Sequence, residues 1–393
     1  MYTVENSRHF TKRIDPVSGM TCYVLSTRVA PIQQAFYFVN SGLSGDGRYF
    51  WFYCAFPPTP GHCMGVVDLL TDEVRVFPET FAGDAIFAVE PDSGNVWWGT
   101  AQGYFIRTPH PGDKPLLAAP LPRLGRFGAA GTHLTFSRDR REMFVDIQCS
   151  DRSVLGSIDI ASGTFTEWFR TEEGVPYNHA QFNPVDPNLA LCAHEYHVDK
   201  ATGKSFPPPR TEDGIYPRLH TVTRDGVDTM YPPMYDVAGH EWWSADGKKI
   251  YYEDGHRIIR WDLEKGCNEL VVDGDRFHDP DKFDATVWHA HCSADEKYFT
   301  ADSDYWLENC PRFWRGNASH VSFYNTVTDR HVDIVSYNPT VPEWTPERQC
   351  PYHIDPHPRF VLNDQWITFT TTVDGRVDAA IAPVAPLLRA TED

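Results

Sequence analysis

Short runs of alternating aromatic or β-branched residues recur along the chain, each after a turn phrase with Asp, Gly or another polar residue. The seven phrases are SGDGRYFWF from Ser44, PDSGNVWWG from Pro91, SRDRREMFV from Ser137, NPVDPNLAL from Asn183, SADGKKIYY from Ser244, SADEKYFTA from Ser293 and LNDQWITFT from Leu362. Most begin about 45 to 50 residues after the previous one, with longer gaps after the fourth and the sixth. Alternation with a period of two predicts half-buried strands, and Asp and Gly favour tight turns. Each phrase therefore predicts a turn between two neighbouring strands.

A second phrase often follows about 20 residues later, as in VVDLLTDEV from Val66, SIDIASGTF from Ser157 and RWDLEKGCN from Arg260. It predicts a hairpin between two outer strands. Several strands in a repeat of this length are typical of a β-propeller. We therefore predict an all-β, seven-bladed β-propeller in which residues 1–393 form a single domain, with two unrelated β-sandwich domains as the alternative. We expect the strand Thr21–Thr27 to complete the last blade, because closure of the ring removes exposed sheet edges.

Composition narrows the possible partners. The formal net charge of −19 argues against nucleic acid as a partner, because nucleic-acid binding needs a basic surface. No apolar run approaches the roughly 20 residues of a membrane-spanning helix, so we expect no membrane partner. The N-terminus lacks the apolar segment of a signal peptide, and the nine cysteines include no CxxC pair. We therefore expect free thiols in a cytoplasmic protein, and the sequence predicts no particular oligomeric state.

The positions of the 17 histidines are more informative than their number. In a propeller, the innermost strand of each blade lines the central channel, and its first residue lies at the channel mouth. The residues six or seven positions before the turn aspartates are His133, His179, His240, His289 and His357, and the corresponding residues of the first two repeats are Asn40 and Ile86. Imidazole is a common metal ligand and a base near neutral pH. Five histidines at one level predict a functional site, with a hydrogen-bonded plug of the channel as the alternative.

One short segment is especially rich in metal-ligand side chains. Residues 348–358, RQCPYHIDPHP, contain a glutamine, two histidines and an aspartate close to one entry strand. Together with His289 from the neighbouring blade, this segment can provide three or four ligands for one cation. Imidazole combined with carboxamide or carboxylate oxygen suits Mn²⁺ or another divalent ion better than a closed structural zinc site.

These motifs resemble those of the oligogalacturonate lyases, a family of seven-bladed propeller enzymes, in the same order along nearly the whole chain. The matching segments are DPVSGMTCYVLST near the N-terminus, Cys192-Ala193-His194-Glu195, Arg218, His240-Glu241-Trp242-Trp243, His289 and the closing Gln349…Asp355-Pro356-His357-Pro358. The chain departs from the family at Asp355, where the family has a histidine, and the gap after Gln349 is about three residues longer. Either His353 replaces the missing imidazole or Asp355 is itself a ligand.

The resemblance implies a divalent cation, for which we expect Mn²⁺, with Ca²⁺ and Zn²⁺ as alternatives. Its implied ligands are His289, Gln349, His353 and His357. The implied reaction is β-elimination in short uronate-containing oligosaccharides, so the expected partner is an acidic oligosaccharide. His240 is the implied base for the C5 proton, and Arg218 with the cation stabilises charge on the uronate carboxylate. The residues expected to line the sugar subsites are His133, His179, Gln181, His194, Glu195 and Trp243.

Two other functions fit parts of the pattern. A non-catalytic propeller would bind a glycan or a protein, but it would not need clustered imidazoles. A metal-dependent hydrolase or epimerase would keep the sugar and the cation. Hydrolysis normally uses a pair of carboxylates that flank the glycosidic bond, and the predicted channel mouth carries histidines instead.

Overall fold

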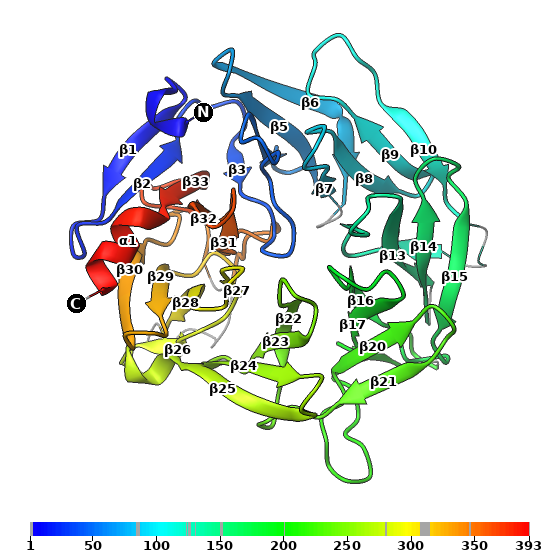
Figure 1. Cartoon of the computed structure of the whole chain (residues 1–393). Coiled ribbons are helices and arrows are strands. Elements are labelled where there is room, and N and C mark those ends of the chain that lie inside the picture. Colours follow the sequence, from blue (N-terminus) through cyan, green and yellow to red (C-terminus); the bar gives the residue numbers. More distant parts are fainter. Residues whose placement is uncertain are drawn as a thin grey trace.

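The computed structural model describes residues 3–83, 87–122, 124, 127–129, 131–149, 152–199, 201–279, 281–306, 315–345 and 347–392. Seven antiparallel sheets follow one another around a central axis (Figure 1). The predicted all-β, seven-bladed β-propeller is thereby confirmed. Within the described residues the only α-helix is α1 (Val384–Thr391), beside two 3-10 helices at Val4–Asn6 and Gly274–Arg276.

The first six sheets run outward from the axis in sequence order, so that the first strand of each faces the channel (Figure 1). The first blade consists of β3 (Ile32–Gln34), β4 (Tyr49–Ala55), β5 (His62–Asp68) and β6 (Glu73–Ala82). The second consists of β7 (Phe87–Val89), β8 (Val96–Thr100), β9 (Gly103–Arg107) and β10 (Leu116–Pro120). The third consists of β11 (Phe127–Ala129), β12 (Thr135–Phe136), β13 (Glu142–Cys149), β14 (Ser153–Asp159) and β15 (Phe165–Arg170).

The next three blades repeat this arrangement. The fourth consists of β16 (Asn178–Phe182), β17 (Leu189–Ala193), β20 (Leu219–Thr223) and β21 (Asp228–Tyr231), with a small hairpin of β18 (His197–Val198) and β19 (Ser205–Phe206) inserted between β17 and β20. The fifth consists of β22 (Gly239–Trp243), β23 (Lys249–Glu253), β24 (Arg257–Asp262) and β25 (Cys267–Asp273). The sixth consists of β26 (Phe283–Ala285), β27 (Ala290–Cys292), β28 (Tyr298–Tyr305), β29 (Ser319–Asn325) and β30 (Arg330–Asn338).

The last blade joins the two ends of the described chain. Its strands, from the axis outward, are β31 (Arg359–Val361), β32 (Trp366–Thr371), β33 (Asp378–Pro383), β2 (Thr21–Leu25) and β1 (Phe10–Ile14). Strand β2 pairs with β33 through Tyr23 opposite Ile381 and Val24 opposite Ala380. The N-terminal strand therefore lies in the last blade, and Figure 1 shows the blue and red segments side by side.

The recurring turn phrases have a common structure. In four of them the serine hydroxyl donates a hydrogen bond to the turn aspartate two residues later, at 2.6 to 2.8 Å; these pairs are Ser44–Asp46, Ser137–Asp139, Ser244–Asp246 and Ser293–Asp295. The same aspartate oxygen accepts the N–H group that follows, for example that of Lys248 at 3.0 Å. Such turns hold the inner two strands of a blade together, which is why the phrase marks each repeat.

The hydrophobic core lies between neighbouring blades. All seven residues of β4 and all seven of β5 are buried, because blades cover both faces of the sheet. Between the third and fourth blades, the ring of Phe144 lies 4.9 Å from that of Trp168 and 5.2 Å from that of Phe182. No helix among the described residues has the length and apolar character that a membrane crossing requires.

Candidate active site and metal centre

Three of the predicted mouth histidines have an unusual backbone conformation. The φ angles of His179, His240 and His357 are 54°, 46° and 49°, in the left-handed region. Strands β16 and β22 change register across His179 and His240, respectively. A bulge of this kind redirects one side chain of a strand, and strained backbone angles concentrate at functional sites. The local structure thus turns these imidazoles toward the centre of the ring.

Tyr37 lies at the centre of this layer of imidazoles. It comes from the loop after β3, is 7% exposed, and its ring lies 4.6 Å from that of His357 and 5.2 Å from that of His133. It also contacts the rings of His179, His289 and His353, at 5.7 to 6.4 Å. The first blade therefore contributes Tyr37 to this layer. The predicted mouth residue Asn40 donates a hydrogen bond to the carbonyl oxygen of Phe87 at 2.7 Å instead, and Ile86 lies outside the described residues.

Four side chains gather in the arrangement of a metal site. His289, His353, Asp355 and His357 each offer a ligand atom, and these atoms all lie within 4.8 Å of one another. His289 comes from the loop between β26 and β27, and the other three come from the segment before β31. Both alternatives left open by the sequence, His353 and Asp355, are thus present in the group. Nε2 of His353 lies 2.9 Å from Oδ2 of Asp355.

Two imidazole nitrogens in this group are well suited to a cation. Nε2 of His289 and Nε2 of His357 are buried and have no hydrogen-bond partner. Burial lowers the pKa of both imidazoles well below the usual range, so both are neutral. Burial alone would raise the pKa of Asp355, but the hydrogen bond and charge of His353 lower it to about 2. Neutral imidazole and ionised carboxylate are the forms that bind metal ions, so the donor set fits a divalent cation.

Asp302 on β28 holds two of these histidines in place. Its Oδ1 accepts a hydrogen bond from the backbone N–H of His289 at 2.7 Å, and its Oδ2 accepts one from the backbone N–H of His357 at 2.9 Å. Oδ2 also lies 3.0 Å from Nδ1 of His289. An Nδ1–H that donates to this carboxylate leaves Nε2 of His289 directed at the metal site. Burial, aided by the charge of Asp355, raises the pKa of Asp302 to about 7.

Gln349, the fourth ligand implied by the resemblance, has a different environment. Its side chain is exposed, and its Oε1 accepts a hydrogen bond from the backbone N–H of Arg315 at 3.5 Å. The carboxylate of Asp355 occupies the oxygen-donor place within the group instead.

His240 belongs to a second group at the same level. Its Nδ1 lies 2.7 Å from Oε1 of Glu253, which is almost fully buried on β23. The imidazole of His240 lies 4.1 Å from that of His289, measured between ring centres, and 5.0 Å from the ring of Trp288. A carboxylate that accepts from Nδ1–H leaves Nε2 of His240 as a proton acceptor beside the metal site. This is the arrangement of an oriented general base.

Arg218 lies in a buried network of opposite charges. Its Nε donates to Oε2 of Glu241 at 3.0 Å, and its Nη1 lies 3.5 Å from Oε1 of Glu195. Nδ1 of His179 lies 3.0 Å from Oε1 of Glu241, and its Nε2 lies 3.7 Å from Oε2 of Glu195. Two basic groups and two carboxylates thus share one network, in which Nη2 of Arg218 also lies 3.3 Å from Nδ1 of His179.

The network favours the charged form of all four groups in spite of burial. Burial opposes ionisation of Glu195, but His179 and Arg218 lower its pKa to about 2. Burial is likewise outweighed at Glu241, where Arg218 and His179 lower the pKa. The two carboxylates in turn raise the pKa of His179 and of Arg218 against the effect of burial.

Four further residues predicted to bind sugar take different positions. His133 is 3% exposed, and its ring stacks on that of His179 at 4.8 Å. Burial and the charge of His179 lower the pKa of His133 well below its usual range. The ring of His194 faces those of Tyr177 and His220, at 5.7 and 6.4 Å. Burial and the charge of His220 lower the pKa of His194 to about 4.

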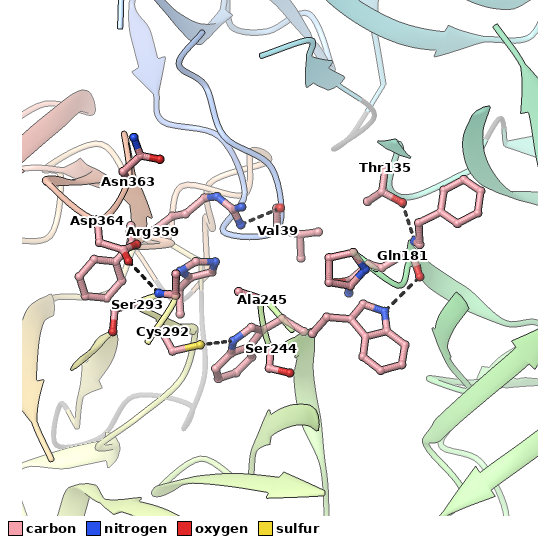
Figure 2. Close-up of a pocket in the computed structure, with 17 residues that line it drawn as sticks. Val39, Thr135, Gln181, Ser244, Ala245, Cys292, Ser293, Arg359, Asn363 and Asp364 are labelled. Atoms are coloured by element: carbon pink, nitrogen blue, oxygen red, sulfur yellow. Dashed lines mark hydrogen bonds between the residues drawn. The ribbon is translucent and has the colours of Figure 1, made fainter. Parts of the chain in front are cut away.

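Gln181 and Trp243 line a pocket of about 370 Å³ at a deeper level of the channel (Figure 2). Its walls are residues further along the inner strands, together with the turns that end them at Ser244, Ser293 and Asp364. The mouth histidines are not among its lining residues. Figure 2 shows Gln181 across the pocket from Arg359, which donates to the carbonyl oxygen of Val39 at 2.7 Å. The side-chain amide of Gln181 donates to the carbonyl oxygen of Glu241 at 2.8 Å, and its backbone carbonyl oxygen accepts from the indole N–H of Trp243. Gln181 and Trp243 thus support the strands below the mouth histidines.

The sequence interpretation did not identify the residues that orient the histidines. Glu241, Glu253 and Asp302 each place a carboxylate on an imidazole, and Tyr37 fills the centre of the layer. A signal for two of them exists, because Glu253 and Asp302 both follow their mouth histidine by 13 residues.

Comparison with known proteins reveals similar folds. No family model matches the sequence, and no curated protein sequence matches it significantly. Among solved structures, an oligogalacturonate lyase in complex with manganese is 16% identical, with a TM-score of 0.69 over 95% of this chain and 96% of that one. An oligogalacturonate lyase from Vibrio parahaemolyticus is also 16% identical, with a TM-score of 0.70 over the same shares of the two chains. At this identity the likeness shows a shared fold.

Proposed function

We propose that this chain is a metal-dependent lyase that cleaves short uronate-containing oligosaccharides by β-elimination. The observation that carries the proposal is the contact between the His240 imidazole and the group formed by His289, His353, Asp355 and His357. An oriented base and a set of metal ligands are the two parts that this chemistry requires. The likeness to oligogalacturonate lyase structures supports the scaffold.

The metal ligands in this proposal are His289, His353, Asp355 and His357, and Gln349 is replaced by the carboxylate of Asp355. A divalent cation held there, for which we expect Mn²⁺, would supply positive charge against the substrate carboxylate. That charge makes the neighbouring C5 proton more acidic.

His240 is the proposed catalytic base. Glu253 accepts from Nδ1–H and fixes the tautomer in which Nε2 takes the C5 proton. Because Glu253 is 2% exposed, its hydrogen bond to His240 is shielded from water. After proton removal the electron pair of the C5–H bond forms the C4–C5 double bond, the bond from C4 to the glycosidic oxygen breaks, and the leaving oxygen takes a proton from water.

Arg218 and His179 are proposed to hold the anionic sugar at the mouth. Glu195 and Glu241 raise the pKa values of both groups, which favours their protonated forms. The side chain of Glu195 is 42% exposed, so its carboxylate can accept hydrogen bonds from the hydroxyl groups of an entering sugar. His133 supports His179 by stacking, and His194, Gln181 and Trp243 support the surrounding strands.

The same network disfavours hydrolysis. A glycosidase needs one carboxylic acid that stays protonated near neutral pH. The charges of Arg218 and His179 lower the pKa values of Glu195 and Glu241, so both remain ionised and neither can donate a proton.

The cytoplasmic location stays a prediction.

The proposal is tested with galacturonate and other uronate di-, tri- and tetrasaccharides in the presence of Mn²⁺. The product has a C4–C5 double bond conjugated to the carboxylate, and its ultraviolet absorbance is followed over time. We expect turnover by the unaltered chain and a loss of about 100-fold or more in His240→Gln, because a positioned base contributes that much. Calorimetry should show that His240→Gln still binds Mn²⁺.

A matched control is His256→Gln, which alters a histidine–aspartate pair at the surface, where Nδ1 of His256 lies 2.9 Å from Asp275. This variant should keep full activity. Absence of turnover on every uronide with Mn²⁺ present would overturn the proposal.

A further inference from the structure

The outer half of the sixth blade contains a second group of metal-ligand side chains. His278, His331 and Asp333 each offer a ligand atom, and these atoms lie within 4.8 Å of one another. His331 and Asp333 lie on β30, the outermost strand of the blade, and His278 follows the 3-10 helix Gly274–Arg276. His289 belongs to the inner edge of the same blade, so this group is separate from the candidate active site.

The register of the blade places further polar groups on the same face. Ser322 on β29 pairs with Asp333, and Tyr324 pairs with His331. The Ser322 hydroxyl donates to Oδ1 of Asp333 at 2.6 Å, and the Tyr324 hydroxyl lies 2.9 Å from Nε2 of His278. Five polar side chains thus converge at one point between the blade and the preceding linker.

His320 adds an independent observation. It lies two residues before Ser322 on β29, is 1% exposed, and its Nε2 has no hydrogen-bond partner. Its ring lies 4.3 Å from that of His278, measured between ring centres. A buried nitrogen without a partner is costly unless a ligand satisfies it. The orphaned nitrogen lies on the imidazole next to the group.

The group is accessible from outside the blade. His331 and Asp333 are only half-buried, which leaves a path for an ion from solvent. Imidazoles with one carboxylate are a common ligand set for Zn²⁺.

We propose that His278, His331 and Asp333, with His320 beside them, form a second divalent-cation site that binds Zn²⁺. The ion would join the linker between the fifth and sixth blades to the outermost strand of the sixth. Its role is structural, because all of its ligands lie on the outer strands and the linker, away from the channel.

The test measures zinc stoichiometry after removal of all metal with a chelator and dialysis against Zn²⁺. We expect two equivalents in the unaltered chain and one in His357→Ala, which loses the channel site. His331→Ala should also bind one equivalent, and the double variant none. Zn²⁺ should raise the unfolding temperature of His357→Ala and should not raise that of the double variant.

Two further variants keep the test decisive. Asp333→Asn has the same shape as the original residue and can still accept from Ser322, so it removes the charge with the least risk to folding. It should bind Zn²⁺ more weakly by about 10-fold or more, measured in the His357→Ala background. His256→Ala, in the turn between β23 and β24 of the fifth blade, should bind as the unaltered chain does.

The outcomes separate this proposal from the proposed lyase function. A chain that binds one equivalent, lost in His331→Ala and kept in His357→Ala, supports the outer site although the channel site fails. If His357→Ala binds no Zn²⁺, or if its equivalent survives the added His331→Ala change, the proposal of a second site is overturned and the group is only a hydrogen-bonded network.

Discussion

Replacement of Asp302 by asparagine tests whether one buried carboxylate organises the metal centre. Asp302 is 1% exposed and faces three donors, the backbone N–H groups of His289 and His357 and Nδ1 of His289. The change keeps the shape of the side chain and replaces one oxygen with an NH₂ group. Whichever way the amide is oriented, at least one of the three donors then meets another donor.

Asp302→Asn should affect both folding stability and metal affinity. The most favourable orientation keeps the oxygen at the Oδ2 position, where it accepts from His357 and from Nδ1 of His289. The backbone N–H of His289 then loses its partner, and an unsatisfied buried donor costs about 1–3 kcal/mol of folding stability. Loss of a carboxylate behind a metal-ligating histidine weakens metal binding by about 10- to 100-fold.

The assay is calorimetric titration of metal-free Asp302→Asn with Mn²⁺, together with urea unfolding of the same samples. Asp295→Asn is the matched control, because Asp295 lies on an exposed turn of the same blade and accepts from Ser293. The control should bind Mn²⁺ with unchanged affinity. If Asp302→Asn binds Mn²⁺ as tightly as the unaltered chain, Asp302 does not orient His289 for metal binding and this reasoning is refuted.

Two other predictions concern acid stability and ring closure. The folded-state pKa of Glu195 is about 2, below its ordinary 4.5, so its stabilising effect is present above about pH 4.5 and is lost as the pH falls toward 2. Thermal unfolding between pH 2 and 7 should therefore show a shallower acid loss for Glu195→Gln than for the unaltered chain, and parallel curves would contradict this. Leu25→Ala, at a fully buried position in β2, should cost about 2–5 kcal/mol in urea unfolding. Val17→Ala, at a position 79% exposed in the β1–β2 turn, should stay within about 0.5 kcal/mol, and equal effects of the two changes would refute a closure held by buried contacts.

The sequence was sufficient to predict the propeller because its turn chemistry repeats. In four of the seven phrases the serine and the aspartate make a local hydrogen bond, so the signal lies within a few neighbouring residues. The same repeat gave the level of the mouth histidines, since the distance from mouth to turn is fixed by the length of the inner strand. Local patterns of this kind are visible without knowledge of distant contacts.

The partners of those histidines depend on pairing between strands, and the sequence interpretation missed them. Yet Glu253 and Asp302 occupy equivalent places, 13 residues after His240 and His289, because the second strand of each blade returns to the mouth. Asp146 follows His133 by the same interval and accepts from Thr132, whose hydroxyl in turn accepts from the N–H of His179. Alignment of the repeats by register would have revealed these carboxylates.

Other features of the site had no such signal. Tyr37 reaches the centre through a loop of the first blade that does not follow the repeat. The exposed position of Gln349 depends on the long segment before β31, in which spacing along the chain does not determine distance in space. Contacts made by loops are therefore the part of the site that the sequence could not predict.

The pairing of β2 with β33 also has a consequence for the order of assembly. Val24 of β2 and Ala380 of β33 are opposite each other in the finished sheet but lie near opposite ends of the described chain. During synthesis, β2 therefore leaves the ribosome long before β33 exists. Until then β2 has a free edge on which other chains can add, and such long-range pairing is slow to form. The segment that contains His353 and His357 belongs to the same late-formed blade, so the candidate metal centre is completed only near the end of folding. A nascent chain is thus most prone to association at the stage when its candidate metal centre is still incomplete.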